Sequence, residues 1–167
     1  MLELVVHRRT AELKGLDADD RATDSGTETD PDEYDNVDSI IDHTTFDQLL
    51  DLDDEDHTFT RGLVDRYFDQ AKKTFIEMES AIASKNYPEL SRLGHFFKGS
   101  SAALGLTKIK DSCEKLLQHL GNLKDTVAAK PISLSEDETV IRELLEQMRK
   151  EYEQVETFLK LFYDGEQ

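Results

Sequence analysis

The chain contains little of what disulfide-stabilised, membrane-spanning or nucleic-acid-binding proteins require. It has one cysteine, Cys113, so no internal disulfide can form, and we expect a buried thiol in a reducing compartment. No apolar run approaches the roughly 18 residues of a membrane span. Acidic residues outnumber basic ones by 37 to 20, and the net charge of −17 would repel the phosphates of nucleic acid. We therefore expect neither a membrane nor a nucleic acid as a partner.

Much of the negative charge lies in the first 40 residues, which carry twelve acidic and four basic side chains. Within this part, residues 17–39 are rich in Asp, Glu, Thr and Ser and nearly empty of large apolar side chains. Such a segment buries too little apolar surface to offset the entropy lost on ordering. We therefore predict a disordered acidic tail over residues 1–39, followed by one folded domain over residues 40–167.

From residue 40 onward, apolar residues recur at a spacing of three or four, which is the period of an amphipathic helix. No segment alternates with a period of two, so no strand is expected. The second predicted helix has its apolar stripe begin at Phe59 and continue through Leu63 and Tyr67. The predicted helices are a short one near residues 41–50 and four long ones near residues 59–82, 88–104, 107–120 and 136–162.

The residues between these helices support the same division. Pro88 suits the first turn of the third helix, and Gly105 suits a left-handed cap at its end. Gly121 to Ser133 contains a proline and no sustained period, which indicates a loop or a frayed helix end. Ser135 to Glu138 is typical of a capping box at the start of the last helix. The predicted fold class is all-α: an up-down four-helix bundle with the short N-terminal helix lying across one end or side.

The third predicted helix carries the residues that could take part in a reaction. On a helical wheel, Leu93, Phe97 and Leu104 lie about 160° to 180° from His95, so the imidazole is predicted to point away from the core. The residues that share its face are Ser91, Arg92, Lys98, Gly99 and Ala102.

This face offers a nucleophile, a cation and open space. A neutral imidazole is available near neutral pH, and Lys98 lies one turn onward from His95. Gly99 costs a helix interior roughly 1 kcal/mol relative to Ala, which makes sense where something must approach the backbone. Gly94 repeats this argument more weakly. A lone exposed histidine is often only a surface residue, so the pattern itself leaves both interpretations open.

The string from Leu93 to Gly105, LGHFFKGSSAALG, resembles the phosphorylation motif of histidine-containing phosphotransfer (HPt) domains. It is most similar to the fungal proteins that link a hybrid histidine kinase to response regulators in osmotic-stress relays. The resemblance continues in residues 59–63, 68–71 and 113–115, and covers roughly residues 40–121.

The resemblance implies that His95 accepts a phosphoryl group from the receiver-domain aspartate of a hybrid histidine kinase and passes it to a response-regulator aspartate. It further implies that Lys98 stabilises the phosphoryl charge and that Gly99 leaves clearance for the receiver. The other residues implied to lie around the site are Gln70, Glu114 and Arg92. The family often carries a Gln at the position of Leu117, and the adjacent Gln118 is rotated by about 100°.

The resemblance also implies a docking surface for receiver domains. Its residues are Leu49, Leu52, Phe59, Leu63 and Phe96. Alternatively, these side chains only pack the first helix onto the bundle. We expect both roles, with Phe59 and Leu63 more buried than Leu49 and Leu52.

The chain has no Gly-x-x-x-x-Gly-Lys loop, so it is predicted to be a phosphocarrier without an ATP site or autophosphorylation. No metal site or cofactor is assigned to it, since Mg²⁺ is expected from the receiver domain. We expect a monomer in the cytoplasm and nucleus.

The alternative function is a receiver-binding adaptor bundle that carries no phosphoryl group. The remaining histidines, expected as surface or capping residues, are His7, His43, His57 and His119.

Overall fold

The computed structural model describes residues 40–53, 58–127 and 134–164, and the predicted tail over residues 1–39 lies outside this part of the chain. Within the described ranges the regular structure is entirely helical, which confirms the all-α class. The helices are α3 (His43–Leu50), α4 (Thr58–Ala83), α5 (Tyr87–Ala103), α6 (Thr107–Val127) and α7 (Leu134–Asp164).

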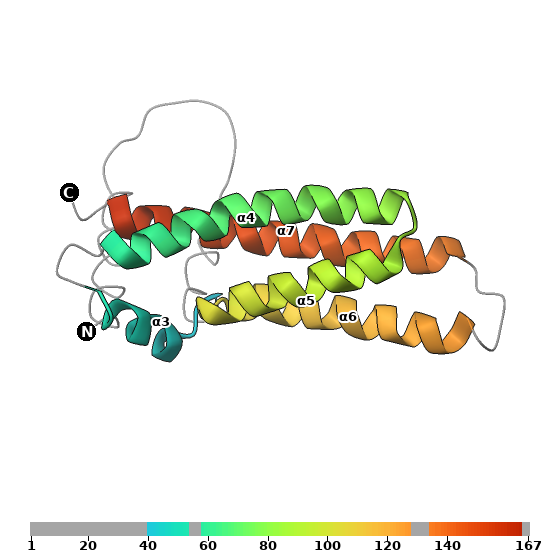
Figure 1. Ribbon diagram of the computed structural model, residues 1–167, viewed down its shortest axis with the longest axis horizontal. Helices are drawn as coiled ribbons and strands as arrows, with labels where there is room; N and C mark the ends of the chain where they lie inside the picture. Colours follow the sequence, from blue (N-terminus) through green and yellow to red (C-terminus); the bar gives the residue numbers. More distant parts are fainter. Residues whose placement is uncertain (1–39, 54–57, 128–133, 165–167) are drawn as a thin grey trace, which may run out of the picture.

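The four long helices form an up-down bundle (Figure 1). Successive helices reverse direction and pack against each other, and α4 also packs against α7, which closes the bundle. The short α3 lies at the end of the bundle where α5 finishes and α6 begins; the sequence predicts an end or a side without saying which.

The inner face of α4 differs from the predicted stripe at its beginning. Phe59 is 54% exposed, and the buried stripe starts instead at Thr60 and Val64. Since neighbouring residues on a helix are about 100° apart, Phe59 lies on the flank of the first turn. Leu63, four residues later, is only partly buried against the core. The stripe continues through Tyr67, Phe68, Ala71, Thr74, Phe75, Met78, Ala81 and Ile82.

The turn between α5 and α6 holds α3 in place. Gly105 has a φ of 72°, which confirms the predicted left-handed cap, and its carbonyl accepts a hydrogen bond from Asp42 N at 2.7 Å. A Cβ on Gly105 would lie 2.9 Å from Asp42 O and 3.2 Å from Thr45 Cβ. The close approach of α3 therefore requires a glycine here.

The last two helices are longer than predicted. Helix α6 continues to Val127, so of the two predictions for this stretch the loop is wrong over residues 121–127, which form the end of the helix. Leu123 extends the apolar stripe of α6 and packs against the core, and this contact outweighs the weak helix preference of Gly121. Helix α7 begins at Leu134, ahead of the start that a cap at Ser135 would set.

Cys113 is fully buried on α6, as predicted. Its Sγ lies 3.5 Å from Sδ of Met148 on α7. Burial raises the pKa of this thiol to about 12, mainly because a thiolate would lose its hydration. The described residues contain no helix with the length and apolar content of a membrane span.

Replacing Gly105 with Ala should lower the free energy of unfolding by about 2 kcal/mol, since the left-handed conformation alone costs a residue with a Cβ roughly 1–2 kcal/mol. Urea unfolding measures the change. The control is Gly62→Ala in α4, where an added Cβ meets nothing within 4 Å. The free energy of unfolding of that variant should rise by about 0.5–1 kcal/mol. Equal stability of the two variants would show that the turn between α5 and α6 does not need its glycine.

Candidate functional site

The inner face of α5 is fixed by aromatic packing against α4. The ring of Phe97 stacks on that of Tyr67, with centroids 5.9 Å apart and planes inclined by 12°. The ring of Phe75 meets Phe97 edge-on at 5.2 Å. Leu90 and Leu93 complete this buried face. Because these contacts set the rotation of α5 about its axis, they also set what the opposite face presents to solvent.

A buried hydrogen bond reinforces the same contact. The hydroxyl groups of Tyr67 and Ser101 lie 2.9 Å apart, and Ser101 is fully buried. Burial raises the pKa of Tyr67, so its hydroxyl stays protonated. Ser100 is half-buried and donates to Phe97 O at 3.1 Å. Both serine hydroxyl groups therefore find hydrogen-bond partners within the bundle.

His95 is exposed on the opposite face of α5. Phe96, Gly99 and Ala102 are also exposed, and Lys98 is half-buried. The helical wheel thus describes this face correctly. An imidazole in the middle of a firmly packed helix can be reached from outside without any movement of the core.

Lys98 forms an ion pair across the seam between α5 and α6. Its Nζ lies 3.5 Å from Oε2 of Glu114, and both side chains are partly exposed to water. Exposed pairs of this kind contribute only about 0–1 kcal/mol. Glu114 therefore holds the ammonium near the seam, but weakly enough for a more highly charged anion to displace it.

The two glycines near His95, Gly94 and Gly99, have different surroundings. A Cβ on Gly99 would meet nothing within 4 Å, so its small size serves no contact among the described residues. A Cβ on Gly94 would lie 3.1 Å from Cδ2 of Leu117 on α6. Gly94 is buried, and what approaches the backbone there is Leu117 of α6, not a partner from outside.

The departure from the family pattern on α6 has a structural counterpart. Leu117 is half-buried and packs against the backbone of α5 at Gly94. Gln118 is exposed, as its rotation around the helix predicts. An apolar side chain therefore occupies the α6 position where the family often carries a glutamine.

The remaining predicted site residues are Gln70 on α4 and Arg92 on α5 itself. Gln70 on α4 is half-buried, and its Nε2 is buried without a hydrogen-bond partner in the described part of the chain. Arg92 is exposed and donates two hydrogen bonds to Glu89, at 2.9 and 2.6 Å. These bonds are the main cause of the raised pKa of Arg92 and of the lowered pKa of Glu89. The guanidinium charge is thus already paired on its own helix.

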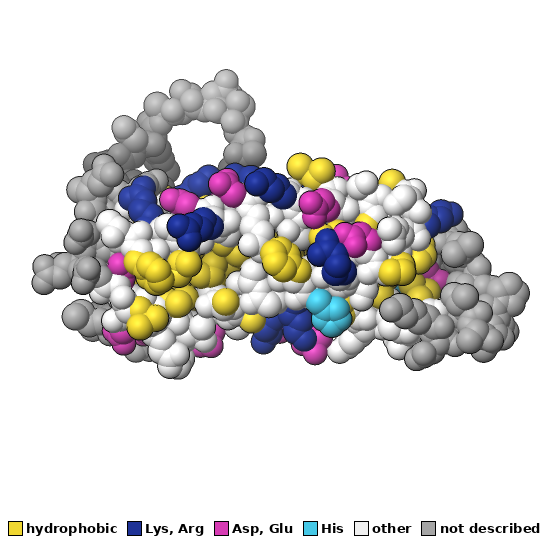
Figure 2. All heavy atoms as spheres, viewed as in Figure 1, with side chains coloured by type: hydrophobic (Ala, Val, Ile, Leu, Met, Phe, Trp, Pro, Cys, Tyr) yellow, Lys and Arg dark blue, Asp and Glu magenta, His cyan; other side chains and the backbone are white. Residues whose placement is uncertain are grey.

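The predicted docking residues divide into two groups. Leu52, Phe59 and Phe96 are 74%, 54% and 51% exposed. Leu49 and Leu63 are partly buried and pack against the core. The expectation that Phe59 is more buried than Leu49 is wrong, because Phe59 lies on the flank of the first turn of α4. Figure 2 shows apolar side chains gathered at one end of the molecule, the end where α3 lies beside the start of α4.

One of the other histidines was placed wrongly by sequence reasoning. His119 is half-buried rather than at the surface, with Nε2 3.5 Å from Oδ1 of Asp137, and links α6 to α7. His43 is the first residue of α3 and is half-buried. Among the residues that the structure describes, no three His, Cys, Asp or Glu side chains gather as metal ligands.

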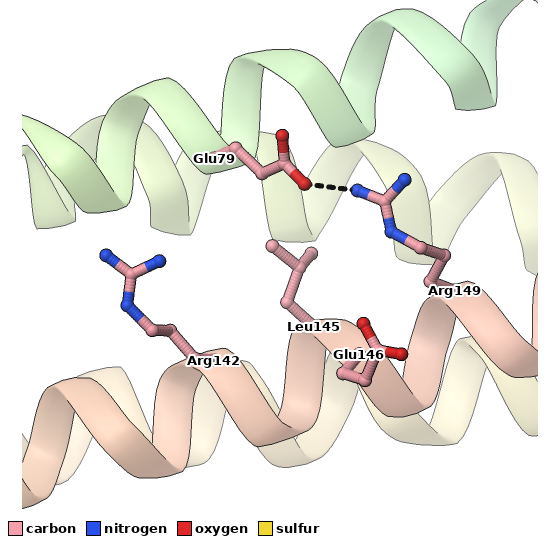
Figure 3. Close-up of a pocket in the computed structure, with 5 residues that line it drawn as sticks. All are labelled: Glu79, Arg142, Leu145, Glu146 and Arg149. Atoms are coloured by element: carbon pink, nitrogen blue, oxygen red, sulfur yellow. Dashed lines mark hydrogen bonds and ion pairs between the residues drawn. The ribbon is translucent and has the colours of Figure 1, made fainter.

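A shallow groove of about 280 Å³ lies between α4 and α7. In Figure 3, Arg142 and Arg149 project from α7 on either side of Leu145, and Arg149 reaches Glu79 on α4. Arg142 pairs with Glu138 at 2.8 Å, and the guanidinium of Arg149 also covers the ring of Phe75. Both guanidinium groups already have carboxylate partners, so the groove is better explained as a closed seam than as a ligand site.

The fold and the site together define a class: a helical bundle that presents one histidine to solvent, with a lysine and a glycine beside it, from a helix whose other face is locked. The family model of the Hpt domain matches residues 62–158, which is more than half of the chain. The chain therefore belongs to the Hpt domain family.

Fungal proteins are among its relatives. Over 86 residues the chain is 49% identical to multistep phosphorelay regulator 1 of Schizosaccharomyces pombe, covering 51% of this chain and 29% of that protein. Over 83 residues it is 46% identical to phosphorelay intermediate protein YPD1 of Saccharomyces cerevisiae, covering 49% of each. The chain thus spans about half or less of the curated relatives it matches.

A solved structure extends the likeness to the fold. It is the co-crystal structure of the Saccharomyces cerevisiae histidine phosphotransfer signaling protein Ypd1 with the receiver domain of its downstream response regulator Ssk1. The TM-score is 0.66 at 31% sequence identity, covering 75% of this chain and 95% of the Ypd1 chain.

The different surroundings of the two glycines predict different effects of alanine. Gly99→Ala should raise the free energy of unfolding by about 0.5–1 kcal/mol. Alanine loses less conformational entropy than glycine in a helix, and its Cβ would meet no other atom here. Gly94→Ala should gain less or lose stability, since Leu117 must move. Urea unfolding of both variants measures the difference. In a Leu117→Ala background, Gly94→Ala should show its full gain; equal gains in the unaltered background would contradict the tight contact.

Proposed function

We propose that this chain is a phosphorelay intermediate that carries a phosphoryl group on His95. It accepts the group from the receiver-domain aspartate of a hybrid histidine kinase and passes it to the aspartate of a response regulator. The observation that carries this proposal is the exposed imidazole on the outward face of a locked helix, beside Lys98 and the open backbone at Gly99. The names of the two fungal relatives support it.

The chemistry requires a nucleophile and charge neutralisation. A ring nitrogen of His95 attacks the phosphorus of the aspartyl phosphate; the N–P bond forms as the P–O bond to the aspartate breaks, and the electron pair leaves with the carboxylate. Donation to the next aspartate reverses these steps. Positioning and electrostatics dominate phosphoryl transfer, so little other chemistry is asked of the chain.

Lys98 is placed to supply charge on the chain's side. A phosphoryl group carries up to two negative charges, whereas Glu114 offers one and is partly hydrated. The ammonium can therefore exchange Glu114 for the phosphoryl oxygens when His95 is loaded. In this scheme Mg²⁺ belongs to the receiver domain, and the family resemblance implies that Gln70 and Arg92 lie around the reacting group.

The partner would dock on the apolar surface beside His95. The exposed side chains Leu52, Phe59 and Phe96 supply contact area, and Leu49 and Leu63 support them from the core side. Gly99 leaves room for the receiver to approach α5. The solved relative in complex with a receiver domain supports partners of this kind. We further propose that the protein acts as a monomer, in the cytoplasm and nucleus, in an osmotic-stress relay.

Incubation with a phosphorylated receiver domain and Mg²⁺ should transfer label to the wild-type chain, and His95→Gln should take up none because the nucleophilic nitrogen is gone. The label should be acid-labile and alkali-stable, as expected for phosphohistidine. Gel autoradiography of the separated proteins measures it.

The matched control is His119→Gln, which alters a half-buried histidine on α6 and should accept label like the wild type. A wild-type chain that binds receivers but stays unlabelled with several of them would contradict phosphoryl carriage and favour a receiver-binding adaptor.

Lys98→Ala should accept the phosphoryl group about 10- to 100-fold more slowly, since one charge-stabilising donor is lost. Its stability should change by no more than about 1 kcal/mol, because both side chains of the ion pair with Glu114 are partly exposed to water. Rapid-quench transfer kinetics and urea unfolding measure the two effects. Lys150→Ala, which removes an exposed lysine from α7, is the charge-matched control. Equal transfer rates for both variants would remove Lys98 from the mechanism.

A further inference from the structure

One carboxylate joins the two sides of the connection between α3 and α4. Asp53 directly follows the exposed Leu52 at the end of α3. Its Oδ1 accepts a hydrogen bond from the backbone N–H of Phe59 at 3.0 Å. Its Oδ2 accepts from both the N–H and the hydroxyl of Thr60, each at 2.6 Å. The same side chain therefore lies next to one exposed docking residue and binds the backbone of another.

These bonds cap α4 from a distance. The first N–H groups of a helix have no partner within the helix and are usually bound by the side chain of the residue just before it. Here the acceptor comes from six and seven residues earlier in the chain. A negative charge at this end also interacts favourably with the helix dipole. The cap thus fixes the first turn of α4 relative to α3.

The α3 side of this link is itself anchored. Asp53 N donates to Leu50 O at 3.1 Å, which holds Asp53 against the last turn of α3. Phe46 on α3 is buried and packs edge-on against Phe162 of α7 at 5.8 Å. The start of α3 is bound to the turn at Gly105 through Asp42 N. Because Asp53 is itself held against α3, its hydrogen bonds fix the position of the start of α4 relative to α3.

Phe59 needs such support because more than half of its side chain is exposed. A half-exposed ring on the first turn of a helix gains little from packing, and helix ends fray when their N–H groups lose their acceptors. A frayed first turn would no longer hold Phe59 in a fixed position relative to Leu52. Binding would then have to include the entropy cost of ordering both side chains.

We propose that Asp53 is a positioning residue for receiver docking: it holds Leu52 and Phe59 in the arrangement that the partner contacts. This inference rests on the proposed function, in which these residues form part of the docking surface. Asp53 acts through the apolar side chains and has no part in the reaction at His95.

The test compares Asp53→Ala and Asp53→Asn with a control, Asp51→Ala. Asp51 is exposed at the end of α3, and the hydrogen bond it makes there uses its backbone N–H, which the substitution keeps. The control therefore removes the same charge beside the docking surface without removing the cap. The probes are a receiver domain to which the wild type transfers label, and phosphoramidate, a small donor that needs no docking surface.

Asp53→Ala should weaken receiver binding about fivefold or more, the effect expected from losing a helix cap. Asp53→Asn, which keeps one acceptor oxygen, should fall between this variant and the wild type, and Asp51→Ala should stay within about twofold. Labelling of His95 by phosphoramidate should be unchanged in all variants. Backbone amide exchange at Phe59 and Thr60, followed by NMR, should accelerate in Asp53→Ala.

Unchanged receiver binding in Asp53→Ala would overturn the proposal. An equal loss in Asp51→Ala would also overturn it, because charge alone would then explain the effect. A parallel loss of phosphoramidate labelling would assign Asp53 a general structural role instead. If wild-type His95 takes label from neither donor, it is the proposed function that fails, and this outcome is distinct from the other three.

Discussion

The outward direction of His95 depends on the burial of the opposite side of its own helix. Phe97 is held between Tyr67 and Phe75, and the absence of a side chain at Gly94 lets α6 press against the backbone of α5. A rotation of α5 that turned the imidazole inward would expose this aromatic face and bury Lys98. Such a rotation would cost the burial free energy of several side chains, so the imidazole of His95 is presented by a rigid element.

Much of this arrangement could be predicted from the sequence, because a helical period fixes which residues share a face. The wheel placed His95 opposite Phe97 correctly, and Gly105 was recognisable as a left-handed cap. Phe59 was misplaced because a wheel does not show where the neighbouring helices lie around the first turn of α4. The contact of Gly94 with Leu117 was missed for a related reason. Periodicity within one helix carries no information about which residue of another helix lies opposite.

In the proposed relay the bundle would provide only part of the reaction centre. It offers a nucleophile and one weakly held cation, and the charges around them are largely paired within the chain, as for Lys98 with Glu114 and Arg92 with Glu89. In the proposed relay, the phosphoryl donor, the metal ion and the accepting carboxylate all come from the partner. The chain's own contribution is then geometric, and the same surface can serve partners on both sides of the transfer.

The single cysteine, Cys113, can serve as a built-in probe of how often the bundle opens. Cys113 is fully buried between α6 and α7, with its ionisation suppressed. A thiol reagent can modify it only when these helices separate, so the rate of modification reports how often the bundle opens. No label has to be introduced for this measurement. A partner that binds only the closed bundle would slow the reaction in proportion to its occupancy, which makes the native cysteine a titration signal for complex formation.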